Sequence, residues 1–207
     1  MEEQRNLLPA TVLTRTIQRP NTMIYYPQLA GLANQQAEKD INRAILQTVQ
    51  GLIHEQQRVQ VPGNTQMQGS YEIKTNERGI FSVTMSNYAY TPQMAHGMTF
   101  LGSVTANIHT GKLYTLRELF KPGSDYVNVL SANIKRQIEA RQIPTLNGFT
   151  TIKPDQDFYV ADKSLVIYFQ LYEITPYYVG FPMFPISIYE LEPIIDENGP
   201  LGILAAD

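Results

Sequence analysis

Alternation of apolar and polar residues predicts several strands in this chain. Thr11 to Arg19 and Met23 to Tyr26 are rich in Thr, β-branched or aromatic residues, with the turn Pro20-Asn21 between them and Pro27 ending the second. Three longer runs between residues 70 and 108 alternate with the period of a half-buried strand, which indicates an antiparallel meander with one buried face. The residues expected on that face are Tyr71, Ile73, Phe81, Val83, Met85, Met98, Phe100, Val104, Ala106 and Ile108.

Two segments show the period of amphipathic helices. Asn34 is placed to cap the first helix, and Glu38 in its first turn suits the helix dipole. Ser124 is placed to cap the second helix, and Pro144 stops it. Such stripes are more typical of a core-facing surface than of a groove for a partner. The stripes consist of Ile41, Ile45, Val49, Leu52 and Ile53 in the first helix and of Val127, Leu130, Ile134 and Ile138 in the second.

The last part of the chain returns to strands. Phe158 to Val160 is a short strand, and Leu165 to Leu171 has apolar residues on both faces, as a covered central strand does. Phe184 to Ile188 is the last strand, and Pro182 and Pro185 predict that it begins at an edge or after a bulge. Together the patterns predict an α+β fold, in which an antiparallel β-sheet meander carries two amphipathic helices packed on one face.

The length of 207 residues suits one large domain or two small lobes. We expect a disordered N-terminus over residues 1–9, a compact α+β domain over residues 10–195, and a tail over residues 196–207. A division of the domain into lobes at 10–109 and 110–195 is left open.

Composition excludes several classes of protein. The net charge of −3 gives no basic footprint for nucleic acid, and the lack of cysteine excludes disulfides, thiol catalysis and Cys-ligated zinc. No stretch approaches the roughly 20 apolar residues that cross a bilayer, and MEEQRNLLPATVL is not a signal peptide. The sequence therefore predicts a cytoplasmic protein if Met1 is the native start, whereas a trimmed start leaves an export signal or anchor open.

No catalytic constellation stands out among the polar residues. His96 is either a general base or metal ligand, or a loop residue whose ring bonds the backbone, and we favour the second. Asp155 and Asp157 lie two apart, but the further oxygen ligands of a calcium loop are absent. A glycosidase pair such as Asp157 with Glu173 stays open, because such carboxylates can be far apart in the chain. We expect no metal and no cofactor.

Two loops rich in aromatic residues, Asn87 to Gly97 and Tyr172 to Phe181, follow predicted strands. Tyrosine offers a large contact area at low entropic cost and is enriched in recognition surfaces. The alternative is that the rings roof the core and pack on nearby prolines. If the loops serve recognition, we expect them to form one surface. Its predicted binding residues are Tyr88, Tyr90, Pro92, His96, Tyr172, Tyr177, Tyr178 and Phe181.

Six segments taken together resemble one known domain family. Residues 25–191 are similar to the extracytoplasmic domain of RsiV-type, lysozyme-sensing anti-sigma factors and to the N-terminal region of PdaC-type peptidoglycan deacetylases. The resemblance implies an α+β domain without catalysis of its own and an extracytoplasmic location. In the anti-sigma members such a domain binds lysozyme. The segments are YYPQLAGLANQQAEKDIN (25–42), SYEI (70–73), SNYAYT with AHGMT (86–99), TGKLYTLRELFKPGSDY (110–126), DQDFYVADKSLVIYFQLYEITPY (155–177) and FPISIYEL (184–191).

The predicted function is a non-enzymatic binding or sensing domain of bacterial cell-envelope type. Its expected partner is a lysozyme-like protein or a peptidoglycan fragment, and the oligomeric state is left open. One alternative is a cell-wall glycan hydrolase that uses Asp155, Asp157, Glu173 or His96. Another is a cytoplasmic stand-alone domain with a structural or small-ligand role.

Overall fold

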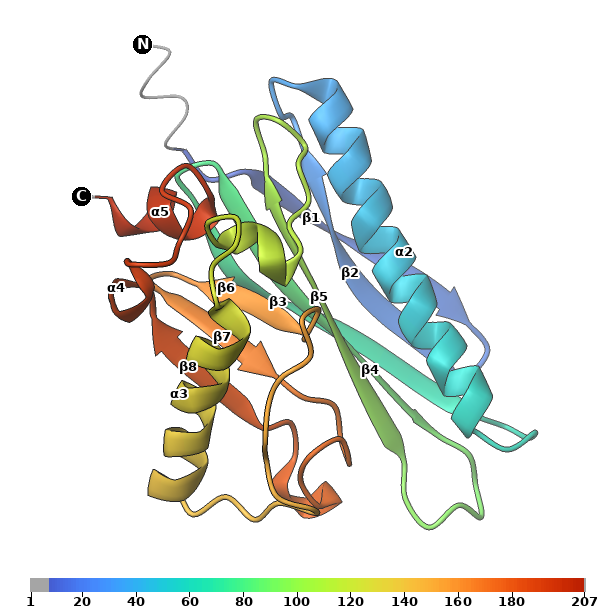
Figure 1. The fold of residues 1–207 in the computed structure, drawn as a ribbon. Coiled ribbons are helices and arrows are strands. Elements are labelled where there is room, and N and C mark those ends of the chain that lie inside the picture. Colours follow the sequence, from blue (N-terminus) through green and yellow to red (C-terminus); the bar gives the residue numbers. More distant parts are fainter. Residues whose placement is uncertain (1–7, 207) are drawn as a thin grey trace. The chain divides into compact units, whose positions relative to one another are not determined.

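Two β-sheets and the helices beside them make up the fold (Figure 1). The computed structural model describes residues 8–206, and within them it confirms the α+β class. The chain divides into two compact units, Met1–Leu113 and Tyr114–Asp207, and each holds one of the sheets. The five-stranded sheet contains β1 (Thr11–Arg19), β2 (Thr22–Ala30), β3 (Gln66–Glu77), β4 (Ile80–Tyr90) and β5 (Met98–Asn107), and the three-stranded sheet contains β6 (Phe158–Ala161), β7 (Ser164–Tyr168) and β8 (Met183–Ser187).

The five-stranded sheet follows chain order and is antiparallel except at one place. There Thr22–Ile24 of β2 pair in parallel with Met67–Gly69 of β3. Parallel neighbours need a long crossover, and helix α2 (Gln35–Val59) supplies it. A Cβ on Gly69 would lie 2.5 Å from Ile24 Cγ2, so glycine permits the close pairing of the two strands. The three strands predicted as a meander, β3 to β5, are consecutive and antiparallel, and the helical crossover joins them to the β1–β2 hairpin.

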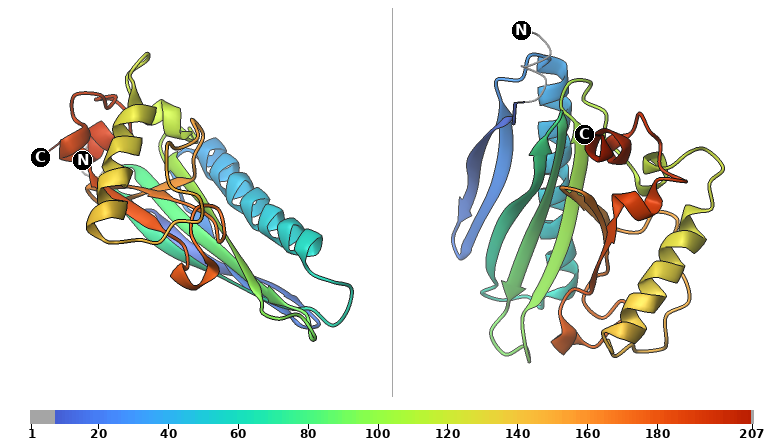
Figure 2. Two further views of the ribbon diagram at one scale, coloured as in Figure 1. Left: turned by 60° about the horizontal axis from the view of Figure 1, so that its bottom comes forward. Right: turned by 90° about the vertical axis from the view of Figure 1, so that its left-hand side faces the viewer.

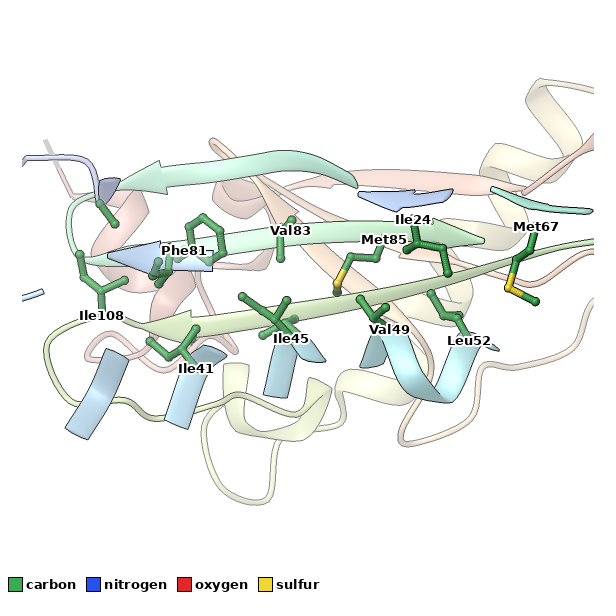
Figure 3. Packing of buried hydrophobic residues seen from close by; sticks show 14 of the residues in the cluster. Ile24, Ile41, Ile45, Val49, Leu52, Met67, Phe81, Val83, Met85 and Ile108 are labelled. Carbon is green, nitrogen blue, oxygen red and sulfur yellow. The ribbon is translucent and has the colours of Figure 1, made fainter. Parts of the chain in front are cut away.

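Helix α2 runs along one face of this sheet (Figures 1 and 2). Its predicted cap is present, because the Asn34 side chain accepts hydrogen bonds from the backbone N–H groups of Gln36 (3.0 Å) and Ala37 (3.1 Å). The apolar stripe of the helix meets the apolar face of the strands in a dense core (Figure 3). The buried residues in this core include Ile24, Ile41, Ile45, Val49, Leu52, Met67, Phe81, Val83, Met85 and Ile108.

Strand β2 continues through Pro27, where the sequence predicted its end. The two-residue turn makes Arg19 and Thr22 a hydrogen-bonded pair, so the alternation along the ladder makes Thr14 and Pro27 a non-hydrogen-bonded pair. The side of Pro27 that lacks an N–H group thus faces away from β1. Pairing with β3 has ended at Ile24, and the ladder loses no bond.

The alternation of β3 is interrupted near its far end. A register shift between Ile73 and Thr75 interrupts the pairing with β4. A bulge of this kind exchanges the two faces of a strand beyond it. Ile73, which was predicted on the buried face, precedes the shift and pairs with the buried Val83, but its side chain is 43% exposed. Beyond the shift, Asn76 lies opposite Phe81, and Thr75 is buried opposite Ser82.

In the second unit, β7 is central and buried on both faces, as its pattern predicted, and β8 is an edge strand. Helix α3 (Tyr126–Ala140) is tied to β8, because Gln137 Nε2 and Arg141 donate to the carbonyls of Pro185 (2.8 Å) and Met183 (2.9 Å). The remaining helices are η1 (Leu116–Leu119), η2 (Tyr177–Val179), α4 (Ile188–Leu191) and α5 (Pro200–Ala205).

Three sequence-based expectations concern the ends of these segments. The cap of α3 is Asp125 and not Ser124, whose hydroxyl is buried without a partner among residues 8–206. The range predicted as a tail contains α5, whose Leu201 and Leu204 are buried. Most of the N-terminus predicted to be disordered, residues 1–7, lies outside the described residues. Within residues 8–206, no helix is long and apolar enough to cross a membrane.

Candidate functional site

The end of helix α2 holds the base of the first aromatic loop. Gln56 is fully buried, and its Nε2 donates to the carbonyls of Asn87 (2.7 Å) in β4 and Met98 (2.9 Å) in β5. One turn later, Gln60 Nε2 donates to the Ala89 carbonyl at 3.2 Å. Two glutamines of one helix therefore fix the strands from which the loop emerges.

The tip of this loop is a turn from Thr91 to Met94, in which the Met94 N–H donates to the Thr91 carbonyl at 3.1 Å. Pro92 occupies the second position, and Gln93 has a φ of 80° in the third. A positive φ there is typical of a type II turn, which favours glycine or asparagine. The Thr91 hydroxyl anchors the turn by donating to Gln60 Oε1 at 3.0 Å. Glutamine is therefore held in a backbone conformation that disfavours its side chain.

The predicted contact residues of the first loop are only partly free. A Cβ on Gly97 would lie 2.3 Å from the ring of Tyr88, so that ring lies directly on the glycine. His96 Nδ1 donates to the Gly97 carbonyl at 2.8 Å. This is the contact expected of a loop histidine whose ring bonds the backbone. Tyr88 is 41% exposed, Pro92 and His96 are exposed, and Tyr90 is half-buried.

The second loop begins with a turn of the same kind. The Glu173 N–H donates to the Gln170 carbonyl at 3.1 Å, and Tyr172 has a φ of 64° in the third position. The Gln170 N–H donates back to Glu173 Oε2 at 2.8 Å and closes the turn from its other side. A bulky side chain with positive φ is an outlier, and such strain is concentrated at functional sites.

The aromatic rings of the second loop differ in exposure. Tyr172 and Tyr177 form a tilted pair with centroids 5.4 Å apart. Tyr178 is 79% exposed and Tyr172 46% exposed, while Tyr177 and Phe181 are half-buried. This loop therefore presents two of its predicted contact residues strongly to the surface. The two aromatic loops belong to different units, and their expected joint surface stays a prediction.

A polar cavity of about 300 Å³ opens beside the second loop. Both ends of the turn, Gln170 and Glu173, belong to its wall. Lys153 Nζ lies 2.8 Å from Glu173 Oε1, and Gln170 Nε2 donates to Asp157 Oδ2 at 2.9 Å. The full lining is Lys153, Asp155, Gln156, Asp157, Gln170 and Glu173.

Asp157 and Glu173 lie in different electrostatic environments in this cavity. Burial raises the pKa of the Asp157 carboxyl; the Gln170 amide opposes this rise, the negative charge of Glu173 adds to it, and weaker contributions come from Lys153 and Asp155. The hydrogen bond and charge of Glu173 raise the pKa of the Lys153 ammonium group. Burial thus makes the charged form of Asp157 less favourable than in water, while Lys153 and Glu173 form an ion pair.

The structure brings together three of the residues proposed for a hydrolase, namely Asp155, Asp157 and Glu173. Glu173 accepts at both oxygens, from Lys153 and from the Gln170 N–H, which leaves it poorly placed as a base or nucleophile. Within residues 8–206, no group of three His, Cys, Asp or Glu side chains is arranged to hold a metal ion. The fourth candidate, His96, belongs to the other unit.

Sequence reasoning missed the residues that organise these loops. Gln56 continues the apolar stripe of α2 one turn after Leu52, and this position was the signal that it faces inward. Lys153 and Gln170 gave no such signal, because only the folded chain brings them to one cavity. Two buried side chains at the loops, Asn87 and Thr175, have polar atoms without a partner among residues 8–206.

Two family models match this chain, one in each of its two compact units. Residues 20–99 match the family described as "Deacetylase PdaC", and residues 117–189 match "Protein of unknown function (DUF3298)". The curated protein "Anti-sigma-V factor RsiV" of Bacillus subtilis (strain 168) is 31% identical over 175 residues, which cover 77% of this chain. The chain belongs to the RsiV/PdaC-type domain family. It spans 60% of the length of that relative.

Solved structures share the fold of this RsiV/PdaC-type chain. A DUF3298-family protein from Bacteroides fragilis has a TM-score of 0.67 at 12% identity, and the match covers 96% of both chains. A second DUF3298-family protein, from Pseudomonas aeruginosa, has a TM-score of 0.64 at 16% identity and covers 92% of this chain and 95% of its own. At such low identity these two proteins support the fold alone.

Proposed function

We propose that this chain is a non-enzymatic recognition domain of bacterial cell-envelope type. Its aromatic loops bind a lysozyme-like protein or a cell-wall ligand, as a sensing domain of an RsiV-type protein would. The observation that carries the proposal is the turn at Tyr172, where a tyrosine that is 46% exposed occupies a backbone position suited to glycine. Strain of this kind at an exposed aromatic residue favours a role in binding.

Binding fits the second loop better than hydrolysis does. A retaining or inverting glycosidase needs one carboxylate free to act as nucleophile or base. Glu173 is instead held by Lys153 and by the Gln170 backbone. The carboxylate therefore serves to shape the turn that presents Tyr172.

The direct test measures binding of the purified chain to lysozyme and to soluble peptidoglycan fragments. Tyr90→Ala and Tyr177→Ala are expected to weaken the interaction at least about tenfold, since aromatic anchors carry much of the energy of such surfaces. Tyr25→Ala and Tyr189→Ala are matched controls, because both tyrosines are exposed but lie outside the aromatic loops. An affinity that both loop variants leave unchanged would contradict the proposed surface.

A further inference from the structure

The cavity beside the Tyr172 turn has a lining suited to a ligand rich in hydroxyl groups. Lys153 and the amides of Gln156 and Gln170 are donors, and the carboxyls of Asp155, Asp157 and Glu173 are acceptors. A sugar hydroxyl both donates and accepts, so it can bond a wall that mixes the two kinds of group. The volume of about 300 Å³ is at the lower end of ligand-binding pockets and suits one sugar ring.

The turn that supplies two residues of this lining also carries an aromatic side chain. Gln170 and Glu173 are the first and last residues of the turn and belong to the wall, while Tyr172 lies between them with its ring partly exposed. The Tyr177 ring stands 5.4 Å from the Tyr172 ring and enlarges the apolar surface. The C–H groups on one face of a pyranose ring pack well on such rings, while its hydroxyl groups need the polar wall.

The charges of the cavity wall favour a positively charged sugar over a neutral one. Three carboxyl groups and one ammonium group line the cavity, and that ammonium is already paired with Glu173. Asp157 accepts a hydrogen bond from Gln170 at Oδ2. A carboxyl group has two oxygens, so Oδ1 can accept a further bond from a ligand. A ligand ammonium group near Oδ1 would supply the positive charge that the half-buried carboxylate lacks.

We propose that this cavity binds a saccharide that carries a free amino group, such as a glucosamine residue, with the ammonium on Asp157 and the ring against Tyr172. The inference rests on the proposed recognition role of the Tyr172 to Phe181 loop and names the ligand of that loop. A sugar bound against the ring would explain why a tyrosine occupies a position with positive φ. A glycine at this position would relieve the strain but would remove the ring.

The test is a titration of the full chain with chitotriose, the trimer of glucosamine, at mildly acidic pH where its amines are ionised. Its fully N-acetylated trimer is the matched control, since it keeps the sugar rings and removes the charge. We expect chitotriose to bind at least about tenfold more tightly than the acetylated trimer, as a charge-assisted hydrogen bond would allow. Carbon NMR of the Asp157 carboxyl is expected to show a lower pKa in the presence of chitotriose.

Two variants locate the site. Asp157→Asn keeps an acceptor for Gln170 and removes the charge, so it is expected to weaken chitotriose binding about tenfold. Tyr172→Gly is expected to weaken binding of both trimers while the thermal unfolding curve shows an intact fold. Glu192→Gln removes an exposed carboxylate outside the cavity and is expected to leave the affinity unchanged.

Two results would overturn the assignment directly: equal affinity for the two trimers, or an affinity for chitotriose that Asp157→Asn leaves unchanged. A third such result is tighter binding of trilysine than of chitotriose at Asp157. The last would assign the cavity to basic peptides. The outcome is separable from that of the proposed function. Lysozyme binding that is lost in Tyr90→Ala, together with equal affinity for the two trimers, would keep the recognition role and remove the sugar site.

Discussion

At the scale of single residues, both aromatic loops place a side chain where the backbone favours glycine. Gln93 and Tyr172 each occupy the third position of a turn with positive φ. Such a conformation costs an L-residue on the order of 1 kcal/mol, because the Cβ atom approaches the carbonyl oxygen. The two loops therefore retain side chains at a cost in stability, which favours a role outside folding.

Replacing Gln93 by glycine is expected to raise the free energy of unfolding by about 0.5–1 kcal/mol, since the strain disappears and an exposed side chain is lost. Urea denaturation would measure the change. Gln68→Gly is the matched control, because Gln68 is exposed on the regular strand β3, and it is expected to lower stability by about the same amount. If Gln93→Gly lowers the free energy of unfolding, as Gln68→Gly is expected to do, then Gln93 is not strained.

Thr175 offers a second test at this scale. Its side chain is fully buried in the second loop, and its hydroxyl has no partner within residues 8–206. Thr175→Val keeps the shape and removes the unsatisfied group, so it is expected to raise the free energy of unfolding by about 1 kcal/mol.

The control for that substitution is Thr105→Val. Thr105 is also buried, but its hydroxyl lies 2.8 Å from the Ser82 hydroxyl in a hydrogen bond. Removing this bond is expected to destabilise the protein by about 1 kcal/mol. If both substitutions shift the denaturation midpoint in the same direction, the difference in hydrogen bonding does not explain the result.

At the scale of elements, α2 does more than cover the sheet with its apolar stripe. Its last turns carry Gln56 and Gln60, whose amides bind the carbonyls of Asn87, Met98 and Ala89. A helix side chain thereby joins two neighbouring strands where they separate into a loop. The position of the first aromatic loop is set by this helix as well as by the strand ladder.

Gln56→Leu is expected to lower the free energy of unfolding by about 2–3 kcal/mol, because two hydrogen bonds to buried backbone are lost. The same change is expected to speed hydrogen exchange of amides in β4 and β5 near the loop. Gln47→Ala is the control, since Gln47 is exposed on the same helix and its loss is expected to cost less than about 0.5 kcal/mol. Normal exchange in the Gln56 variant would mean that the loop base is held by other contacts.

At the scale of the whole molecule, the family matches and the compact units divide the chain in the same way. The PdaC match, residues 20–99, lies in the unit Met1–Leu113, and the DUF3298 match, residues 117–189, lies in the unit Tyr114–Asp207. Each unit has its own sheet, its own amphipathic helix and its own aromatic loop. The polar cavity belongs wholly to the second unit.

The stability of the whole chain should depend on the charge of Asp157. Burial raises the pKa of Asp157 in the folded state, so the folded protein holds this proton more tightly than the unfolded chain does. The contribution of Asp157 to stability is therefore complete below its unfolded pKa and is lost as pH rises through the folded pKa. Asp157→Asn cannot ionise and is expected to gain stability relative to the wild type as pH rises through that window.

Urea denaturation of both proteins, at neutral pH and below the ordinary pKa of aspartate, would measure this difference. The gain from Asp157→Asn is expected to be larger at neutral pH, because more of the wild-type Asp157 is ionised there than below the ordinary pKa of aspartate. A difference in unfolding free energy that is the same at both pH values would show that burial does not control the ionisation of Asp157.

The sequence by itself determined the features that depend on neighbouring residues. The apolar period and the cap at Asn34 predicted α2, and the alternation of Phe81, Val83 and Met85 predicted one buried face of β4. These features follow from local geometry, since a helix or strand brings residues at a fixed spacing to one face. The opposite face of β4, which carries Ser82 and Thr84, is buried as well, and its polar residues gave no sign of this. The sequence also singled out the tyrosines of both aromatic loops, although Tyr88 and Tyr90 lie at the end of strand β4 and only the second loop has its tyrosines between strands.

Only the tertiary structure decided which distant segments meet. The parallel pairing of β2 with β3, the division into two sheets and the contact of Gln56 with Asn87 depend on long-range packing that no local pattern encodes. The same is true of the cavity, in which Lys153 pairs with Glu173 although the strands β6 and β7 lie between them in the chain. Side chains that are far apart in the chain interact only when the fold brings them close together. The order of residues along the chain does not give these distances in space.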